Sequence, residues 1–215
     1  MKNLLYKEFR LVISPLYFLI TLSGALLLIP QWLYFIAMMY FFFFAVPNIF
    51  TFAKAQNDNG FSVMLPVRKR DVVGARVLSV TVLELTQIVS AAVFSVFSRA
   101  LYPGGNFMID ANHAYLGGVL AMYGLFNVVF FPMHYRTAYK VGLPILAAVI
   151  VSVLFAAVIE TLVLAVPAAA YVLDGITGEA LVRQLPVLAA GIVIYVLLTW
   201  LAYKLSVKRF EKVDL

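Results

Sequence analysis

The sequence predicts an all-α membrane protein with six transmembrane helices, and two observations lead to that fold class. Hydrophobic residues make up 64% of the 215 positions, charged residues make up only 12%, and the mean hydropathy is +1.00. A soluble domain contains roughly 45–50% apolar residues, because its outside must be wetted. The apolar residues also gather into runs of about 20, the length of helix that crosses a hydrocarbon core of about 30 Å. We therefore expect residues 1–215 to form a single transmembrane domain.

The first ten residues, MKNLLYKEFR, are expected to form a short helix that lies in the membrane interface. Asn3, Lys7 and Arg10 share one face of such a helix, and apolar side chains occupy the opposite face. That pattern is typical of interfacial amphipathic helices. The alternative is that residues 1–10 are the frayed start of the first span.

Six apolar stretches follow, and each is expected to be a helix. Only helices and closed barrels satisfy their backbone in lipid, and these stretches lack the alternation of barrel strands. Five have the length of a single span: 11–29, 32–53, 77–97, 114–133 and 186–203. The first two are separated only by Pro30 and Gln31, so they should form a tight hairpin. In the fourth span, Gly117 and Gly124 should allow close packing against a neighbouring helix.

The fifth apolar stretch, residues 141–173, is too long for one span. A straight helix beginning at Val141 would reach the opposite boundary near Glu160, at a rise of about 1.5 Å per residue. The remainder, residues 161–184, is expected to lie on the outer surface or to form a re-entrant pair of short helices broken at Pro167. The alternative is one long tilted helix followed by a loop.

The distribution of basic residues predicts the orientation. With both termini in the cytoplasm, fourteen of the sixteen Lys and Arg residues fall on the cytoplasmic side, and the exceptions are Arg99 and Arg183. Such an asymmetry is typical of multi-span proteins, whose cytoplasmic loops are enriched in Lys and Arg. The net charge of +6 is then explained by the membrane surface, and we expect no nucleic-acid partner.

The longest predicted cytoplasmic connection, residues 54–76, reads KAQNDNGFSVMLPVRKRDVVGAR. Residues 57–59 can cap a short helix, residues 61–65 give it an apolar face, and Pro66 ends it. A short helix with exposed apolar side chains outside the membrane favours docking into a groove of a partner protein. The alternative is a helix that lies flat on lipid, held by the basic residues 68–70.

The N-terminal LLYKEFR, the six spans and the LPVRKRDVVGAR segment together resemble permeases of the ABC-2 type transporter family, most closely the small bacterial permease subunits of phenol-soluble-modulin exporters. The resemblance implies an interfacial helix at 1–10, a coupling helix in the 54–76 loop, a re-entrant segment at 161–184, and a dimer of permeases in the bacterial cytoplasmic membrane. It also implies that residues near the coupling helix contact a cytoplasmic ATPase. These would be Asp58, Gly60, Phe61, Met64, Leu65 and Arg68.

The sequence lacks motifs for ATP binding and for hydrolase chemistry. There is no G-x-x-x-x-G-K-[ST] loop, so this chain cannot cradle the phosphates of ATP, and the ATPase should be a separate polypeptide. The chain has no Cys, which excludes disulfides and thiol-ligated metals, and it has no H-E-x-x-H motif. We therefore expect no enzymatic activity and no cofactor in this chain.

Two acidic residues lie inside apolar stretches. Glu84 shares one helical face of the third span with Gln87, and that polar face should be turned toward protein or a water-filled path. Carboxylates within a membrane are candidates for function, so Glu84, Gln87 and Glu160 are candidates for a translocation path. The alternative for Glu84 is a structural hydrogen bond between helices, and Glu160 is expected to be wetted near the outer boundary.

These observations favour the permease subunit of an ATP-driven exporter, powered by a separate ATPase. By resemblance its cargo would be amphipathic peptides, and the apolar interior suits such cargo better than small ions. One alternative is a membrane immunity or sensor protein that transports nothing. Another is an intramembrane enzyme that uses Glu84.

Overall fold

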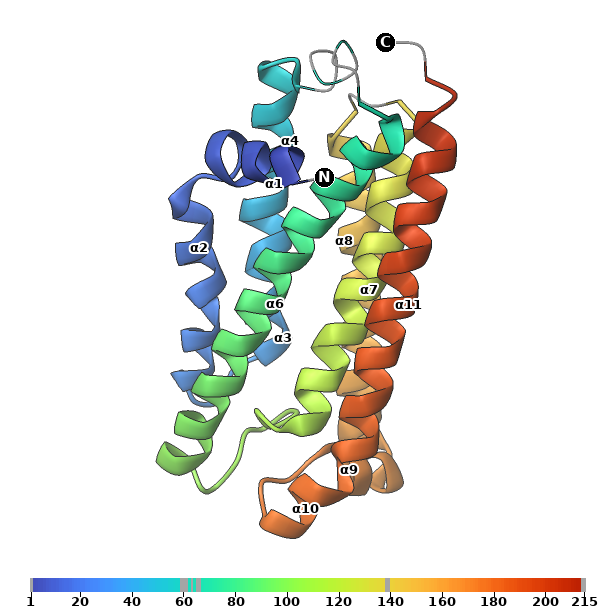
Figure 1. Cartoon of the computed structure of the whole chain (residues 1–215). Coiled ribbons are helices and arrows are strands. Elements are labelled where there is room, and N and C mark those ends of the chain that lie inside the picture. Colours follow the sequence, from blue (N-terminus) through green and yellow to red (C-terminus); the bar gives the residue numbers. More distant parts are fainter. Residues whose placement is uncertain (1, 59–61, 63, 65–66, 138–139, 214–215) are drawn as a thin grey trace.

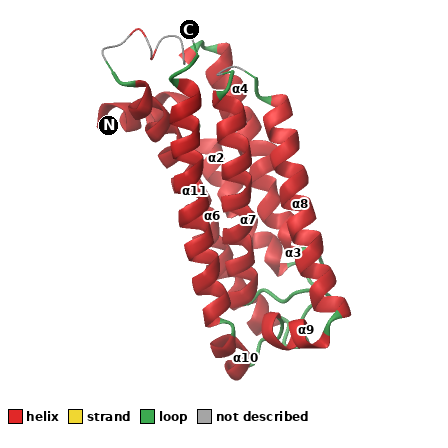
Figure 2. Ribbon diagram, turned by 90° about the vertical axis from the view of Figure 1, so that its right-hand side faces the viewer, coloured by secondary structure: helices red, strands yellow, loops and turns green. Residues whose placement is uncertain are grey.

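The computed structural model describes residues 2–58, 62, 64, 67–137 and 140–213, which contain helices and no strand (Figures 1 and 2). Both termini lie at the same end of an elongated helical bundle (Figure 1). The helices, in chain order, are α1 (Lys2–Lys7), η1 (Glu8–Val12), α2 (Pro15–Thr21), η2 (Leu22–Leu28), α3 (Tyr34–Tyr40), η3 (Phe41–Ala45), α4 (Val46–Ala55), α6 (Lys69–Leu101), α7 (His113–Tyr135), α8 (Gly142–Ala165), α9 (Pro167–Leu173), α10 (Gly178–Arg183) and α11 (Leu185–Phe210). Of these, η1 and η3 are π-helices and η2 is a 3-10 helix.

Five helical segments in the described part of the chain are long and apolar enough to cross a membrane, and a sixth is counted if a bent pair is one span. The first segment joins α3, η3 and α4, and α10 with α11 makes the last. The predicted all-α membrane fold with multiple spans is therefore confirmed, with five or six candidate spans.

The first predicted span begins later than expected. The chain bends by 84° between Asn3–Val12 and Pro15–Leu28, so residues 11–14 do not belong to the span. Ser14 caps the new helix by accepting a hydrogen bond from the amide of Leu16 at 3.4 Å, and Pro15 has the fixed φ that suits a first helical position. The N-terminal helix is consequently a separate element, and it crosses the bundle end instead of continuing into α2 (Figure 1).

The third predicted span is longer than expected. The sequence predicts residues 69–76 in the loop, whereas α6 is one helix of 33 residues from Lys69 to Leu101. Gly74 alone does not interrupt a helix, and no proline follows Pro66 until Pro103. The charge of Arg76, which placed this turn outside the membrane in the prediction, is neutralised inside the protein by ion pairs described below.

The span within the fifth apolar stretch also runs further than predicted. α8 continues past Glu160 to Ala165, and the chain becomes extended at Val166 directly before Pro167, as the residue before a proline prefers. The two short helices α9 and α10 then lie at the end of the bundle opposite the termini (Figures 1 and 2). Glu160 therefore does not end the span. Its carboxylate can lie within the helix because the side chain is buried in the protein and does not face lipid.

α7 is the most deeply buried span, and glycines allow α11 to approach it closely. A Cβ at Gly117 would come within 2.7 Å of the Val187 carbonyl oxygen, and one at Gly124 would come within 3.1 Å of the Tyr195 Cα. The expected close packing of the fourth span is thus present, and its partner is the last span. On the opposite side, stacked rings join α7 to the second span, with the ring centroids of Phe42 and Phe126 3.9 Å apart.

The contact between α7 and α11 gives a test of the packing. A Cβ at Gly191 of α11 would collide with the backbone of Gly117, so Gly191→Ala should force the helices apart. Overpacking of this kind costs about 1–3 kcal/mol. The matched control is Gly142→Ala, where a Cβ meets nothing within 4 Å. Thermal unfolding in detergent should show a lower midpoint for the first variant only, and equal midpoints would contradict the described packing.

Candidate functional site

A buried group of ionic side chains, here called the N-terminal ion cluster, lies at the end of the bundle that holds the termini. It consists of Lys7, Glu8, Asp58 and Arg76. The Arg76 guanidinium on α6 donates to both carboxylate oxygens of Glu8, at 2.5 and 3.2 Å, and to Asp58 Oδ2 at 2.7 Å. One arginine therefore connects α6 to the N-terminal helix and to the segment after α4.

Lys7 completes the cluster from the N-terminal helix. Its Nζ donates to Asp58 Oδ1 at 2.7 Å and to Ser62 Oγ at 3.0 Å, and it lies 3.4 Å from Glu8 Oε1. Two cations thus face two anions, and each of the four side chains is at most 12% exposed. Burying these charges is tolerated because all of them are paired, and removing one partner would leave an uncompensated buried charge.

Sequence reasoning missed the pairing of Glu8 with Arg76, since the two residues are 68 positions apart and stand in two separate segments, LLYKEFR and LPVRKRDVVGAR. The available signal was a single acid in an otherwise basic N-terminal helix. Lys7, expected on the polar face of the interfacial helix, is turned toward Asp58.

The six proposed coupling residues have different surroundings. Asp58 is buried in the N-terminal ion cluster, so its carboxylate is occupied within the chain. Met64 is 84% exposed, and Arg68 is exposed and paired with Asp71 at 2.9 Å. The other three, Gly60, Phe61 and Leu65, lie outside the described residues.

Halfway along the bundle, Glu84 of α6 is completely buried and joins three helices. Its Oε2 accepts hydrogen bonds from Tyr195 Oη of α11 at 2.7 Å and from Asn127 Nδ2 of α7 at 3.0 Å. Asn127 Nδ2 also donates to Thr199 Oγ1 at 3.1 Å. We call Glu84, Asn127, Tyr195 and Thr199 the Glu84 cluster. Its second carboxylate oxygen, Oε1, has no partner among the described residues.

Gln87 is one turn further along the same face of α6, and it is also fully buried. Its Nε2 donates to Ser23 Oγ at 2.6 Å, and its Oε1 accepts from Tyr123 Oη at 2.5 Å. The structure therefore places Glu84 and Gln87 on the interior face of α6, where each connects different neighbouring helices. Glu160 is not near them, because it lies close to the opposite end of the bundle.

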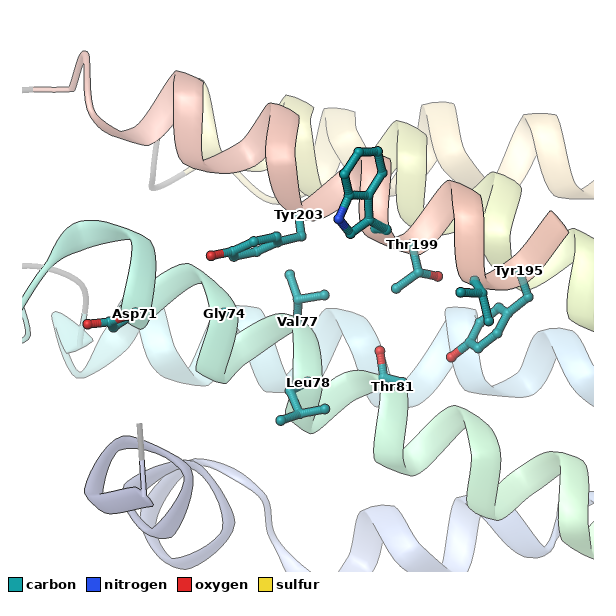
Figure 3. A pocket seen from close by; sticks show the side chains of 10 residues that line it. Asp71, Gly74, Val77, Leu78, Thr81, Tyr195, Thr199 and Tyr203 are labelled. Atoms are coloured by element: carbon teal, nitrogen blue, oxygen red, sulfur yellow. The ribbon is translucent and has the colours of Figure 1, made fainter. Parts of the chain in front are cut away.

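A groove of about 470 Å³ lies between α6 and α11, next to the Glu84 cluster. Thr81 of α6 faces Tyr195 and Thr199 of α11 across it, and these hydroxyls form its polar part together with the carboxylate of Asp71, further along α6 (Figure 3). Its remaining wall is apolar and aromatic, with Leu78, Trp200 and Tyr203 among the lining residues. Such a mixed surface can hold an amphipathic molecule, with the hydroxyls next to its polar side.

At the end opposite the termini, acidic side chains bind the backbone of the loop between α6 and α7. Glu160 Oε2 accepts from the amide of Ile109 at 3.1 Å, and Asp174 Oδ1 accepts from the amide of Asp110 at 3.0 Å. Glu160 is only 5% exposed, so the prediction that it is wetted was wrong. Burial raises the pKa of Asp110 to about 6.

Within the described parts of the chain, no group of three or more His, Cys, Asp or Glu side chains is placed to hold a metal ion. The buried polar groups of the structure instead bind one another and the backbone, and so connect helices and loops.

The family comparison covers nearly the whole chain. A family model described as "ABC-2 family transporter protein" matches residues 3–211. A search of curated proteins and a search of solved structures each gave no match. The match supports a multi-pass membrane protein that works with an ABC ATPase subunit. This chain therefore belongs to the ABC-2 family of transporter proteins and is the permease component of an ABC transporter.

Proposed function

We propose that this permease exports amphipathic peptides across the bacterial cytoplasmic membrane, with both termini in the cytoplasm. ATP is bound and hydrolysed by a separate ABC ATPase subunit, and this chain holds no cofactor. The observation that carries the proposal is the direct bond between Asp58, in the segment expected to meet the ATPase, and Arg76 on α6. That bond connects the proposed docking segment to the helix that carries Glu84.

The coupling step follows from these contacts. The ATPase docks on the segment that contains Met64, whose side chain is exposed at the end of the bundle that holds the termini. A displacement of this segment acts on Asp58, and Asp58 acts on Arg76 through a 2.7 Å ion pair. α6 is one uninterrupted helix of 33 residues, so it can transmit the movement to the Glu84 cluster as a rigid element. Because Glu8 is paired with Arg76 and Lys7 with Asp58, the N-terminal interfacial helix moves together with α6.

The groove between α6 and α11 supports an amphipathic cargo. One wall of the groove belongs to α6, so a movement of α6 relative to α11 changes its width. The hydroxyls of Thr81, Tyr195 and Thr199 can bind the polar groups of a peptide, and the apolar lining can hold its apolar face. This groove is the proposed part of the translocation path in one permease.

A second permease, identical or a paralogue, completes the path in this proposal. The outer faces of α8 and α9 support it. α8 exposes Leu146, Ile150 and Leu154 along one face, and α9 has no buried residue. These surfaces need lipid or another membrane protein as their neighbour. In this proposal α9 and α10 form the re-entrant pair on the outer side of the membrane.

Met64 provides the test of the docking segment. An apolar anchor at an interface that is replaced by a charge should weaken binding at least about 10-fold, which corresponds to about 1.4 kcal/mol. Met64→Asp should therefore lose the ATPase on co-purification in mild detergent. The matched control is Lys212→Asp, which also introduces an acid at an exposed position of the same bundle end.

Because an ABC ATPase acts in the cytoplasm, the same experiment tests the orientation. Retention of the ATPase by Met64→Asp, with loss in Lys212→Asp, would place the docking surface elsewhere. If no ATPase accompanies the unaltered chain, a sensor or immunity protein becomes the better interpretation.

A further inference from the structure

A second cavity, of about 420 Å³, lies between α3 and α8 near the end of the bundle opposite the termini. Its lining is almost entirely apolar, with Phe35, Met39 and Met108 among its residues. Phe43 and Leu164 at its margin are about half exposed, so the cavity is accessible from the lipid-facing side of the helices. Its size falls within the range of small-ligand sites, which is roughly 300–1,000 Å³.

One charged side chain, Glu160, lines this apolar cavity. Its Oε2 is satisfied by the Ile109 amide at 3.1 Å, whereas its Oε1 is buried and has no hydrogen-bond partner among the residues that the structure describes. A buried carboxylate oxygen without a donor costs free energy, so a bound group that donates a hydrogen bond there would be stabilised.

The surroundings of Glu160 indicate the charge of that group. Within the described residues, no Lys, Arg or His nitrogen lies within ion-pair distance of its carboxylate. The acids that bind the neighbouring backbone, Asp110 and Asp174, add negative charge to the same end of the bundle. The cavity thus combines an apolar volume with an uncompensated acid, which favours a cation that carries a hydrocarbon chain.

We propose that this cavity binds an amphiphile with a primary or secondary ammonium group. The hydrocarbon chain occupies the space between α3 and α8, and the ammonium donates an N–H to Glu160 Oε1. A quaternary ammonium has the charge but no N–H donor, and a fatty alcohol has the donor but no charge, so both should bind more weakly. The site is separate from the groove between α6 and α11, and it does not depend on the proposed coupling to an ATPase.

Binding should be measured on the full chain in phosphatidylcholine nanodiscs, because that lipid has no primary amine to compete. The probe is radiolabelled decylammonium, with the signal of empty nanodiscs subtracted. Unlabelled decyltrimethylammonium and decanol serve as competitors with the same chain. We expect saturable binding that decylammonium displaces at least about 10-fold more effectively than either competitor.

Two variants separate the acid from the cavity. Glu160→Gln keeps an oxygen for the Ile109 amide but removes the charge, and it should weaken binding about 10-fold or more. Ala157→Phe fills the cavity from an exposed position of α8 and leaves the carboxylate in place, so it should abolish saturable binding. Equal displacement by decylammonium and decyltrimethylammonium would overturn the proposal. Equal affinity of Glu160→Gln and the unaltered chain would also overturn it. The competitor comparison uses only the unaltered chain, so it decides the matter even if a variant fails to fold.

Discussion

Replacement of Arg76 by leucine is expected to lower the free energy of unfolding by about 3–5 kcal/mol, the cost of removing one partner from a buried ion pair. The substitution leaves Glu8 and Asp58 as buried carboxylates with Lys7 as their remaining cation in the cluster. Thermal or denaturant unfolding in a fixed detergent would measure the loss. Arg76→Lys should recover only part of the lost free energy. A lysine lacks the planar, forked guanidinium that binds both oxygens of Glu8 and also Asp58.

Arg68→Leu is the matched control for Arg76→Leu. Arg68 also begins the α6 region and is paired with an acid, Asp71, but its side chain is 67% exposed. Exposed ion pairs contribute about 0–1 kcal/mol, so this variant should unfold at nearly the unaltered midpoint. If Arg68→Leu and Arg76→Leu were equally stable, the N-terminal ion cluster would not hold the three segments together.

Replacement of Glu84 by leucine is the second change with a large expected effect. It removes the acceptor of Tyr195 Oη and one of the two acceptors of Asn127 Nδ2. Each buried polar group left without a partner costs about 1–3 kcal/mol, so the folded permease should be markedly destabilised. Folded yield and thermal unfolding in detergent would measure this effect.

Glu84→Gln separates the hydrogen bonds from the charge. The amide oxygen can still accept from Tyr195 and Asn127, so a structural role predicts nearly unchanged stability and continued export. Export that is lost while the amount of folded protein stays normal would show that the carboxylate itself takes part in transport. In that case the interpretation of Glu84 as an interhelical hydrogen-bond acceptor would be insufficient.

Much of the bundle could be predicted from the sequence, because lipid imposes helices of known length on apolar stretches. The interior face of α6 was also predictable, since Glu84 and Gln87 are one turn apart and neither can face lipid. The close approach of α7 to a neighbour followed from Gly117 and Gly124, although the sequence could not name α11 as that neighbour.

The helix ends and the ion pairs could not be predicted, because they depend on contacts distant in sequence. Arg76 was assigned to a loop on account of its charge, and only the proximity of Glu8 and Asp58 allows it to be buried in a helix. Glu160 was expected to be wetted for the same reason. Its burial depends on the loop between α6 and α7, which presents the Ile109 amide to it.

We propose that an ATPase drives this permease through the bond between Asp58 and Arg76. Proteoliposomes that contain the chain and its co-purified ATPase should take up a fluorescent amphipathic peptide when ATP is added outside. Asp58→Asn, which weakens the bond but leaves Met64 exposed, should keep the ATPase bound and lose most of the uptake. Uptake that needs no ATP, or uptake that Asp58→Asn leaves unchanged, would contradict this account.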